Sequence, residues 1–242
     1  MKGLPWRFLA FLLLMIGWSA PSAATDARDC LGGDLPAVEG FGEARPLSPG
    51  EAARLFHQGD GVLTLTLRRG PVELRDHENC SADPMTEAYV SCVRHEFVAA
   101  FAEPSGFLVR RSHYEHQDYI WVDREWGTQL RFSHLPRFSP GHRWLVSVSP
   151  SEAGHVFNGI ELFELGPPRT PKPMWRHVPA GAPEDYYLFS FLRWTGPESA
   201  LLCALRENDG TGRCLSPEPV EMRRGPLGWA LRSAVEAASA CR

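Results

Sequence analysis

Residues 113–118 hold the densest set of side chains that could do chemistry, reading His-Tyr-Glu-His-Gln-Asp. Imidazole and carboxylate groups are common ligands of zinc and other divalent metals. On a straight strand, however, side chains alternate between two faces, so at most two of these groups would converge unless a turn intervenes. We interpret the segment as a polar hairpin tip or ligand-binding rim without a metal. Its candidate binding residues are His113, Tyr114, Glu115 and His116.

Other histidines lie in expected loops, which gather at the two ends of a β structure and could bring several of them together. These are His134, His142, His155 and His177. We favour the simpler interpretation that they are scattered surface residues. Among them, His142 is a further candidate binding residue.

Tryptophan and tyrosine side chains fall largely at expected strand positions, where core packing is the simplest role. Trp126 differs because it follows the charged run Asp123-Arg124-Glu125 and precedes a turn glycine. An exposed ring in such a place can serve as a platform for a glycan or a peptide. Trp126 therefore joins the candidate binding residues.

Sequence motifs of several enzyme classes are missing from the chain. It has no Gly-x-Ser-x-Gly motif, no Walker motif and no dinucleotide-binding glycine pattern. Cysteines held in disulfides, as argued below, are excluded as nucleophiles. We expect no cofactor and favour a non-enzymatic binding protein whose partner is a protein or another envelope component. The alternative is a metal-assisted hydrolase that uses loop histidines and carboxylates.

The N-terminus has the parts of a cleaved secretory signal. Lys2 and Arg7 accompany an apolar run of 11 residues at positions 8–18, which is shorter than the roughly 20 residues of a spanning helix. Small residues then lead to an expected cleavage site after Ala24. Cleavage would leave 218 of the 242 residues. We expect an exported protein, periplasmic or secreted, with no stable membrane insertion.

The charge of the expected mature chain argues against nucleic acid as a partner. It would carry 23 basic and 29 acidic residues, a formal net charge of −6. Such a chain has no electrostatic attraction to DNA, RNA or an anionic bilayer. With 43% apolar residues in the full sequence, the chain can fill a core.

All six cysteines follow the expected signal, and an even number in an exported chain favours three disulfides. Two cysteines flank the turn-rich residues 208–212, two bracket a polar loop, and two lie near the chain ends. The expected pairs are Cys203–Cys214, Cys80–Cys92 and Cys30–Cys241. Free buried thiols are the alternative, and zinc is disfavoured because no pair has CxxC spacing.

Alternating hydrophobicity predicts β structure over most of the chain. The expected strands are residues 62–67, 72–74, 96–101, 106–110, 119–123, 129–132, 144–149, 159–165, 186–194, 200–205 and 213–215. A helix should begin at Ser48-Pro49 and end near Gly59, and a second should span 227–240. The proline-rich residues 166–173 should form an irregular connection. We divide the chain into a signal peptide (1–24), an extended lead-in (25–47) and one disulfide-linked β domain (48–242).

One segment resembles a known repeat. Residues 135–146 read Leu-Pro-Arg-Phe-Ser-Pro-Gly-His-Arg-Trp-Leu-Val, and residues 159–163 read Gly-Ile-Glu-Leu-Phe. Together they resemble one blade of a TolB-like or WD-repeat β-propeller, although Gly141-His142 stands where Asp-Gly is usual. The resemblance implies an all-β, propeller-like meander of short antiparallel strands with small terminal helices. About four blades of 40–45 residues would fit. A two-sheet β-sandwich is the alternative.

Overall fold

The computed structural model describes residues 40–77, 80, 90–150, 157–165, 171–179, 187–206 and 218–234. These residues form four antiparallel sheets, with a single short α-helix among them. The expected all-β fold is therefore confirmed. The expected signal peptide, Cys30, Cys214, Cys241, His155 and the strand at 213–215 lie outside the described residues.

Each sheet is a meander in which strands pair antiparallel in chain order. Sheet 1 contains β1 (Phe56–Gly59), β2 (Val62–Leu67) and β3 (Gly70–Arg75). Sheet 2 contains β4 (Arg94–Phe101), β5 (Gly106–Ser112), β6 (Gln117–Asp123) and β7 (Gln129–Phe132). Sheet 3 contains β8 (Arg137–Phe138), β9 (Trp144–Ser149), β10 (Gly159–Leu165) and β11 (Pro171–His177). Sheet 4 contains β12 (Tyr187–Gly196), β13 (Ser199–Arg206), β14 (Glu218–Gly225) and β15 (Gly228–Ser233).

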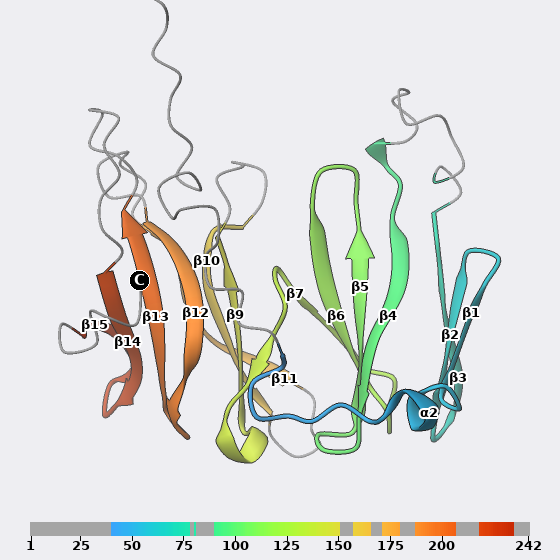
Figure 1. The fold of residues 1–242 in the computed structure, drawn as a ribbon, viewed down its shortest axis with the longest axis horizontal. Helices are drawn as coiled ribbons and strands as arrows, with labels where there is room; N and C mark the ends of the chain where they lie inside the picture. Colours follow the sequence, from blue (N-terminus) through green and yellow to red (C-terminus); the bar gives the residue numbers. More distant parts are fainter. Residues whose placement is uncertain are drawn as a thin grey trace, which may run out of the picture.

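The four sheets stand side by side in chain order, with sheet 1 at one end of the row and sheet 4 at the other (Figure 1). Among the described strands, none of sheet 1 pairs with any of sheet 4. The expected meander of short antiparallel strands is therefore present, but no closed propeller is seen over the described residues. The described residues form four sheets, whereas the expected alternative, a β-sandwich, would have two.

Three apolar cores hold neighbouring sheets together. Leu65 of β2 and Phe107 of β5 belong to the core between sheets 1 and 2. Trp121 of β6 and Phe138 of β8 belong to the core between sheets 2 and 3. Trp144 of β9 packs with sheet 4 in the third core. Sheets 2 and 3 are thus buried on both faces, which explains why β9 is buried at every position.

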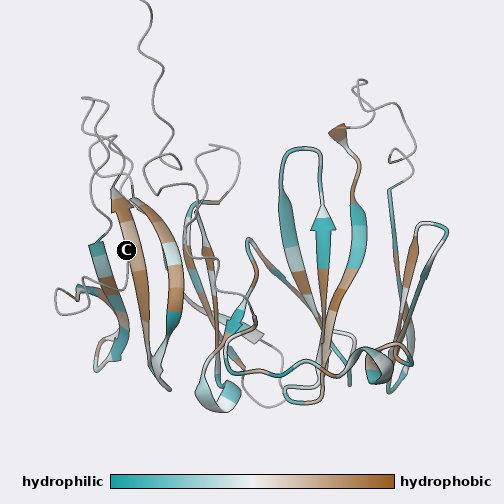
Figure 2. Cartoon of the chain, in the orientation of Figure 1, coloured by the Kyte–Doolittle hydropathy of each residue, from teal (hydrophilic) through white to brown (hydrophobic). Residues whose placement is uncertain are grey.

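Hydropathy changes along the length of sheet 2 (Figure 2). The half of the β5–β6 hairpin nearer the β4–β5 turn is hydrophobic, whereas the half at the hairpin tip is hydrophilic. Accordingly, β5 is fully buried over its first four residues and only partly buried over Arg110–Ser112. A polar end and an apolar middle therefore share one hairpin.

The predicted first helix is shorter than expected. α2 (Pro49–Ala52) has the expected capping box between Ser48 and Glu51, but it ends after four residues. The chain then enters β1, which the sequence interpretation missed. Phe56 at the start of β1 stacks on Phe97 of β4, with ring centroids 3.8 Å apart. This contact between sheets favours an extended chain over further helical turns.

Two predicted connections are strands instead. The helix expected at 227–240 was wrong over β15, which pairs with β14 around the turn at Pro226-Leu227. The irregular connection expected at 166–173 was wrong from Pro171 onward, because β11 begins there and pairs with β10. Prolines are tolerated in β11 because it is the edge strand of sheet 3, where one side of the backbone needs no ladder partner.

The described part of the lead-in, residues 40–47, runs along the β8 and β4 edges of sheets 3 and 2 (Figure 1). Gly42 forms a bridge with Phe138 of β8, and Pro46 forms one with Phe101 of β4. Cys80 is disulfide-bonded to Cys92, as expected. Cys203 is also disulfide-bonded. Over the described residues, no helix has the length and hydrophobicity to span a membrane.

Candidate binding site at the hairpin end of the sheets

Short turns from all four sheets lie along one side of the row, at the lower ends of the strands in Figure 1; we call this side the hairpin end. They follow β2, β4, β6, β8, β12 and β14. Three pockets occupy this end.

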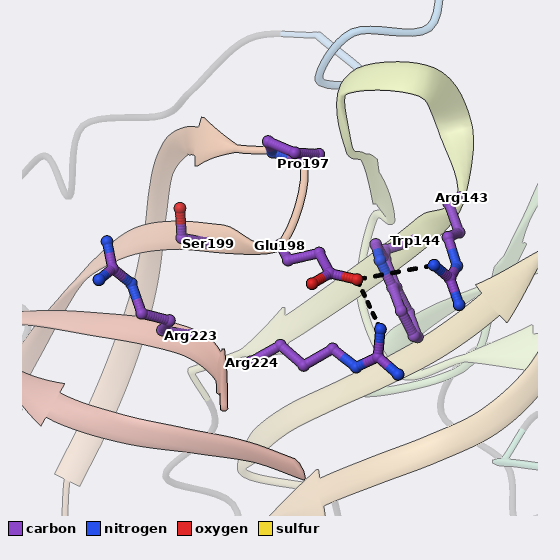
Figure 3. A pocket seen from close by; sticks show the side chains of 7 residues that line it. All are labelled: Arg143, Trp144, Pro197, Glu198, Ser199, Arg223 and Arg224. Atoms are coloured by element: carbon purple, nitrogen blue, oxygen red, sulfur yellow. Dashed lines mark hydrogen bonds and ion pairs between the residues drawn. The ribbon is translucent and has the colours of Figure 1, made fainter. Parts of the chain in front are cut away.

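A pocket of about 490 Å³ opens between sheets 3 and 4 (Figure 3). Arg143 borders it from the β8–β9 loop, Trp144 from the start of β9, Glu198 from the β12–β13 turn, and Arg224 from β14. The turn is held in place because the backbone carbonyl of Glu198 accepts a hydrogen bond from the N–H of Arg224 at 3.0 Å. The pocket thus combines two cations, one carboxylate and an indole.

Two more pockets lie at the hairpin end. One of about 400 Å³ lies between sheets 2 and 3 and is bordered by Glu103, His142 and Arg143. The other, of about 420 Å³, lies between sheets 1 and 2 and is bordered by Glu103 and Trp126. Glu103 and Arg143 each line two neighbouring pockets. We call the three pockets together the hairpin-end groove, bordered by Arg68, Trp126, Glu103, His142, Arg143, Glu198 and Arg224.

Trp126, a candidate from the sequence, is half exposed in this groove, at 51%. Its position is set locally by Asp123, whose buried carboxylate accepts the backbone N–H of Trp126 at 2.7 Å and that of Glu125 at 3.0 Å. The guanidinium of Arg69 stacks over the indole, 3.3 Å from the ring centroid. Trp126 is therefore a fixed ring with one face already covered by a cation.

His142 is the second sequence candidate in the groove. It follows Gly141 in a tight turn, and both residues have positive φ, 56° for His142 and 71° for Gly141. A left-handed backbone is uncommon outside glycine and often accompanies function. The turn is closed by Ser139, whose carbonyl accepts the N–H of His142 at 2.9 Å and whose hydroxyl accepts that of Trp144 at 3.0 Å.

The other four candidates lie at the opposite end of sheet 2, in the loop between β5 and β6. Tyr114 and Glu115 are exposed, whereas His113 and His116 are half-buried with stacked rings 4.2 Å apart. Ligand atoms of both histidines and of Asp118 lie within 4.8 Å of one another. A turn lies between β5 and β6, so three groups converge where a straight strand would bring together at most two.

Asp118 is the buried centre of this cluster. Arg111 donates two hydrogen bonds to it, at 2.6 and 2.7 Å, Arg131 lies 2.5 Å away and His113 3.1 Å away. Burial acts to raise the pKa of Asp118, but the hydrogen bonds and charge of Arg111, with the charges of Arg131 and His113, hold that pKa below its ordinary value. Two guanidinium groups on the carboxylate would repel a cation there.

The remaining described histidines are dispersed. His134 is connected to Ser147 of β9 through its backbone, and burial followed by the charge of Arg137 lowers its pKa to about 4. His177 stacks against Trp175 at the end of β11. Neither lies with His113 and His116 in a group of three possible metal ligands.

Sequence interpretation missed the most charged part of the groove. Arg143, Glu198 and Arg224 lie 26 to 81 positions apart in the chain, and only the stacking of sheet 4 on sheet 3 brings them together. One available signal was the turn chemistry of Gly196-Pro197 and of Gly225-Pro226. Two hairpin turns flanked by charged residues would have indicated two polar loops at a common end.

Comparison with known proteins gives no relative for this chain: no protein-family model, no curated protein and no solved structure matches it.

Proposed function

We propose that this chain is an exported binding protein that holds an extended polypeptide segment of an envelope partner in its hairpin-end groove. The observation that carries the proposal is the line of three adjacent pockets, joined by the shared border residues Glu103 and Arg143. A row of open subsites suits a polymer better than a small compact ligand, which is normally enclosed in one deep cavity.

The side chains along the groove support a polypeptide as the polymer. Trp126 provides a half-exposed ring, and Arg143 and Arg224 provide cations beside the indole of Trp144. Tryptophan and arginine are enriched among the residues that dominate protein–protein binding. Glu103, which borders two of the pockets, adds a hydrogen-bond acceptor for backbone N–H groups.

Export is supported by two independent features. The N-terminal sequence has the charge, apolar run and small residues of a secretory signal. The disulfide between Cys80 and Cys92, together with the bonded state of Cys203, fits an oxidising compartment such as the periplasm or the cell exterior.

A phage-displayed random peptide library panned against the full chain tests the binding function. We expect enriched peptides whose binding is lost, by about tenfold or more, in Trp126→Ala and Arg143→Ala. Arg75→Ala is the matched control, because Arg75 is an exposed arginine of β3 that does not border the groove. Peptides that bind all four proteins equally would argue against a groove function, as would the absence of enrichment.

A metal-assisted hydrolase is the second candidate function. The convergence of His113, His116 and Asp118 favours it, whereas the positions of Arg111 and Arg131 on the same carboxylate disfavour it. Elemental analysis of the purified protein and of His116→Ala is the direct test. Stoichiometric metal that disappears in the variant would support the hydrolase, and its absence from both proteins would remove the chemical basis for it.

A further inference from the structure

Two arginines in the pocket between sheets 3 and 4 share one oxygen of Glu198 (Figure 3). The Nη1 of Arg224 lies 2.6 Å from Glu198 Oε1, and the Nη1 of Arg143 lies 3.6 Å from the same atom. The three side chains come from β14, the β8–β9 loop and the β12–β13 turn. A single carboxylate oxygen therefore marks the point where two guanidinium groups converge.

Both guanidinium groups are held in place by other contacts. Arg143 donates from Nε and Nη2 to Glu164 Oε1, at 3.0 and 2.8 Å, which leaves its Nη1 directed toward Glu198. The guanidinium carbons of Arg143 and Arg224 lie 4.9 and 5.4 Å from the ring centroid of Trp144. Trp144 is itself buried against Trp229 of β15. The cations thus rest on a rigid support.

Glu198, in contrast, is only lightly held. Its side chain is 40% exposed and belongs to a two-residue turn. Exposed ion pairs contribute little to stability, because water solvates both partners well and the side chains lose conformational freedom. A second carboxylate could therefore take its place between the arginines at small cost.

We propose that this pocket is a carboxylate subsite of the hairpin-end groove, in which Glu198 acts as an internal stand-in for a carboxylate of the bound polypeptide. The inference rests on the proposed function and names the chemistry that the groove selects. Arg143 and Arg224 bind the ligand carboxylate, and Trp144 positions them. Glu198 competes with the ligand, so removal of its charge should strengthen binding of an acidic segment.

The test compares three fluorescein-labelled peptides by fluorescence anisotropy with the full chain at low salt. The first is a capped peptide of alternating Ser and Asp, the second a capped peptide of alternating Ser and Asn, and the third the Ser–Asn peptide with a free C-terminal carboxylate. We expect the Ser–Asp peptide to bind about tenfold more tightly than the capped Ser–Asn peptide. Tight binding of the third peptide would identify a terminal carboxylate as the group bound, and its failure to bind would identify side-chain carboxylates.

Variants of Glu198 and Arg224 test the competition between Glu198 and the ligand carboxylate directly. Glu198→Gln should tighten binding of the acidic peptide by about three- to tenfold, whereas Arg224→Ala should weaken it by tenfold or more. Glu73→Gln is the matched control, because Glu73 is a half-exposed carboxylate paired with Arg75 on β3, outside the groove. Unchanged or weaker binding by Glu198→Gln, or equal binding of all three peptides, would overturn the inference.

Failure of this inference and failure of the proposed function are distinguishable. Library peptides that require Trp126 and Arg143 but show no preference for carboxylates would overturn the carboxylate subsite alone. The absence of any peptide that requires the groove residues would overturn both.

Discussion

Asp118 is a buried carboxylate that connects residues from three strands of sheet 2. Arg111 comes from β5, Arg131 from β7 and Asp118 itself from β6. The Asp118 side chain is 3% exposed, so its charge depends on these partners for the solvation that water would otherwise give. Asp118 should therefore affect the folding of the polar end of sheet 2.

The substitution Asp118→Asn should lower the free energy of unfolding by about 2 kcal/mol at pH 7, because it leaves the partly buried guanidinium of Arg111 and the more exposed one of Arg131 without their anion. The folded-state pKa of Asp118 is depressed, so its contribution is fully present above the unfolded pKa of about 4 and is lost as the pH falls through the folded value. Urea unfolding measured from pH 7 to pH 3 should show the wild type and variant converging in acid. A constant difference at every pH would contradict the prediction.

His134 should make stability depend on pH in a different window. Its folded-state pKa is lowered to about 4 by burial and by Arg137, whereas the unfolded chain takes up a proton near pH 6.5. The contribution of neutral His134 is therefore fully present above pH 6.5 and is lost as the pH falls toward 4, by up to about 3 kcal/mol.

In His134→Gln, the slope of unfolding free energy against pH between 6.5 and 4 should be smaller than in the wild type. His57→Gln is the control, because His57 is exposed on β1. Equal slopes in all three proteins would show that His134 titrates normally in the folded state.

Residue types were enough to find only part of the candidate site. Trp126 and His142 could be chosen from the sequence because an aromatic or imidazole ring beside a turn is unusual locally. Arg143 and Arg224 could not, because an arginine beside a strand is common in any β protein. What distinguishes them is their shared position over Trp144, which depends on how two sheets pack.

At the scale of the element, Gly106 illustrates how a strand depends on its neighbour. A Cβ at this position would lie 2.0 Å from Cζ2 of Trp121, which is itself 1% exposed in the core. Gly106→Ala should therefore force Trp121 out of place and lower the free energy of unfolding by at least about 1–3 kcal/mol. Thermal unfolding and the near-ultraviolet circular dichroism of tryptophan would measure both effects.

Gly50→Ala is the matched control for Gly106→Ala. Gly50 lies in α2, where a Cβ would meet no atom within 4 Å, and alanine favours a helix. It should leave stability unchanged or slightly raised. If both alanine variants were equally stable, the close packing of Gly106 on Trp121 would not limit the fold.

Strands with a clear alternating or continuous apolar pattern could be predicted almost residue by residue. The strand expected at 62–67 is β2, and that expected at 144–149 is β9. The errors occurred where the local signal was weak or opposed by tertiary contacts: β1 follows a helix start, β11 begins at a proline, and β15 is alanine-containing. Pairing with a neighbouring strand determines the secondary structure of such segments, and the local sequence pattern does not indicate that pairing.

At the scale of the whole molecule, the row of sheets behaves as a linear stack. Over the described residues, sheet 1 is joined to the rest through one core, which contains Leu65, whereas sheets 2 and 3 each have a core on both faces. In stacked architectures, stability is approximately a sum of contributions from the units and from the interfaces between neighbours. A defect in the core between sheets 1 and 2 should therefore have its largest effect on sheet 1.

Leu65→Ala tests this linear arrangement. Leu65 is fully buried, and its truncation in a core typically costs about 2–5 kcal/mol. Native-state hydrogen exchange should show faster exchange of amides in β2 and β3, a smaller change in β4 and β5, and little change in β12 to β14. This gradient follows because sheet 4 shares no described core with sheet 1. Equal acceleration in all four sheets would instead mean that the stack opens only as one cooperative unit, as a single-core domain does.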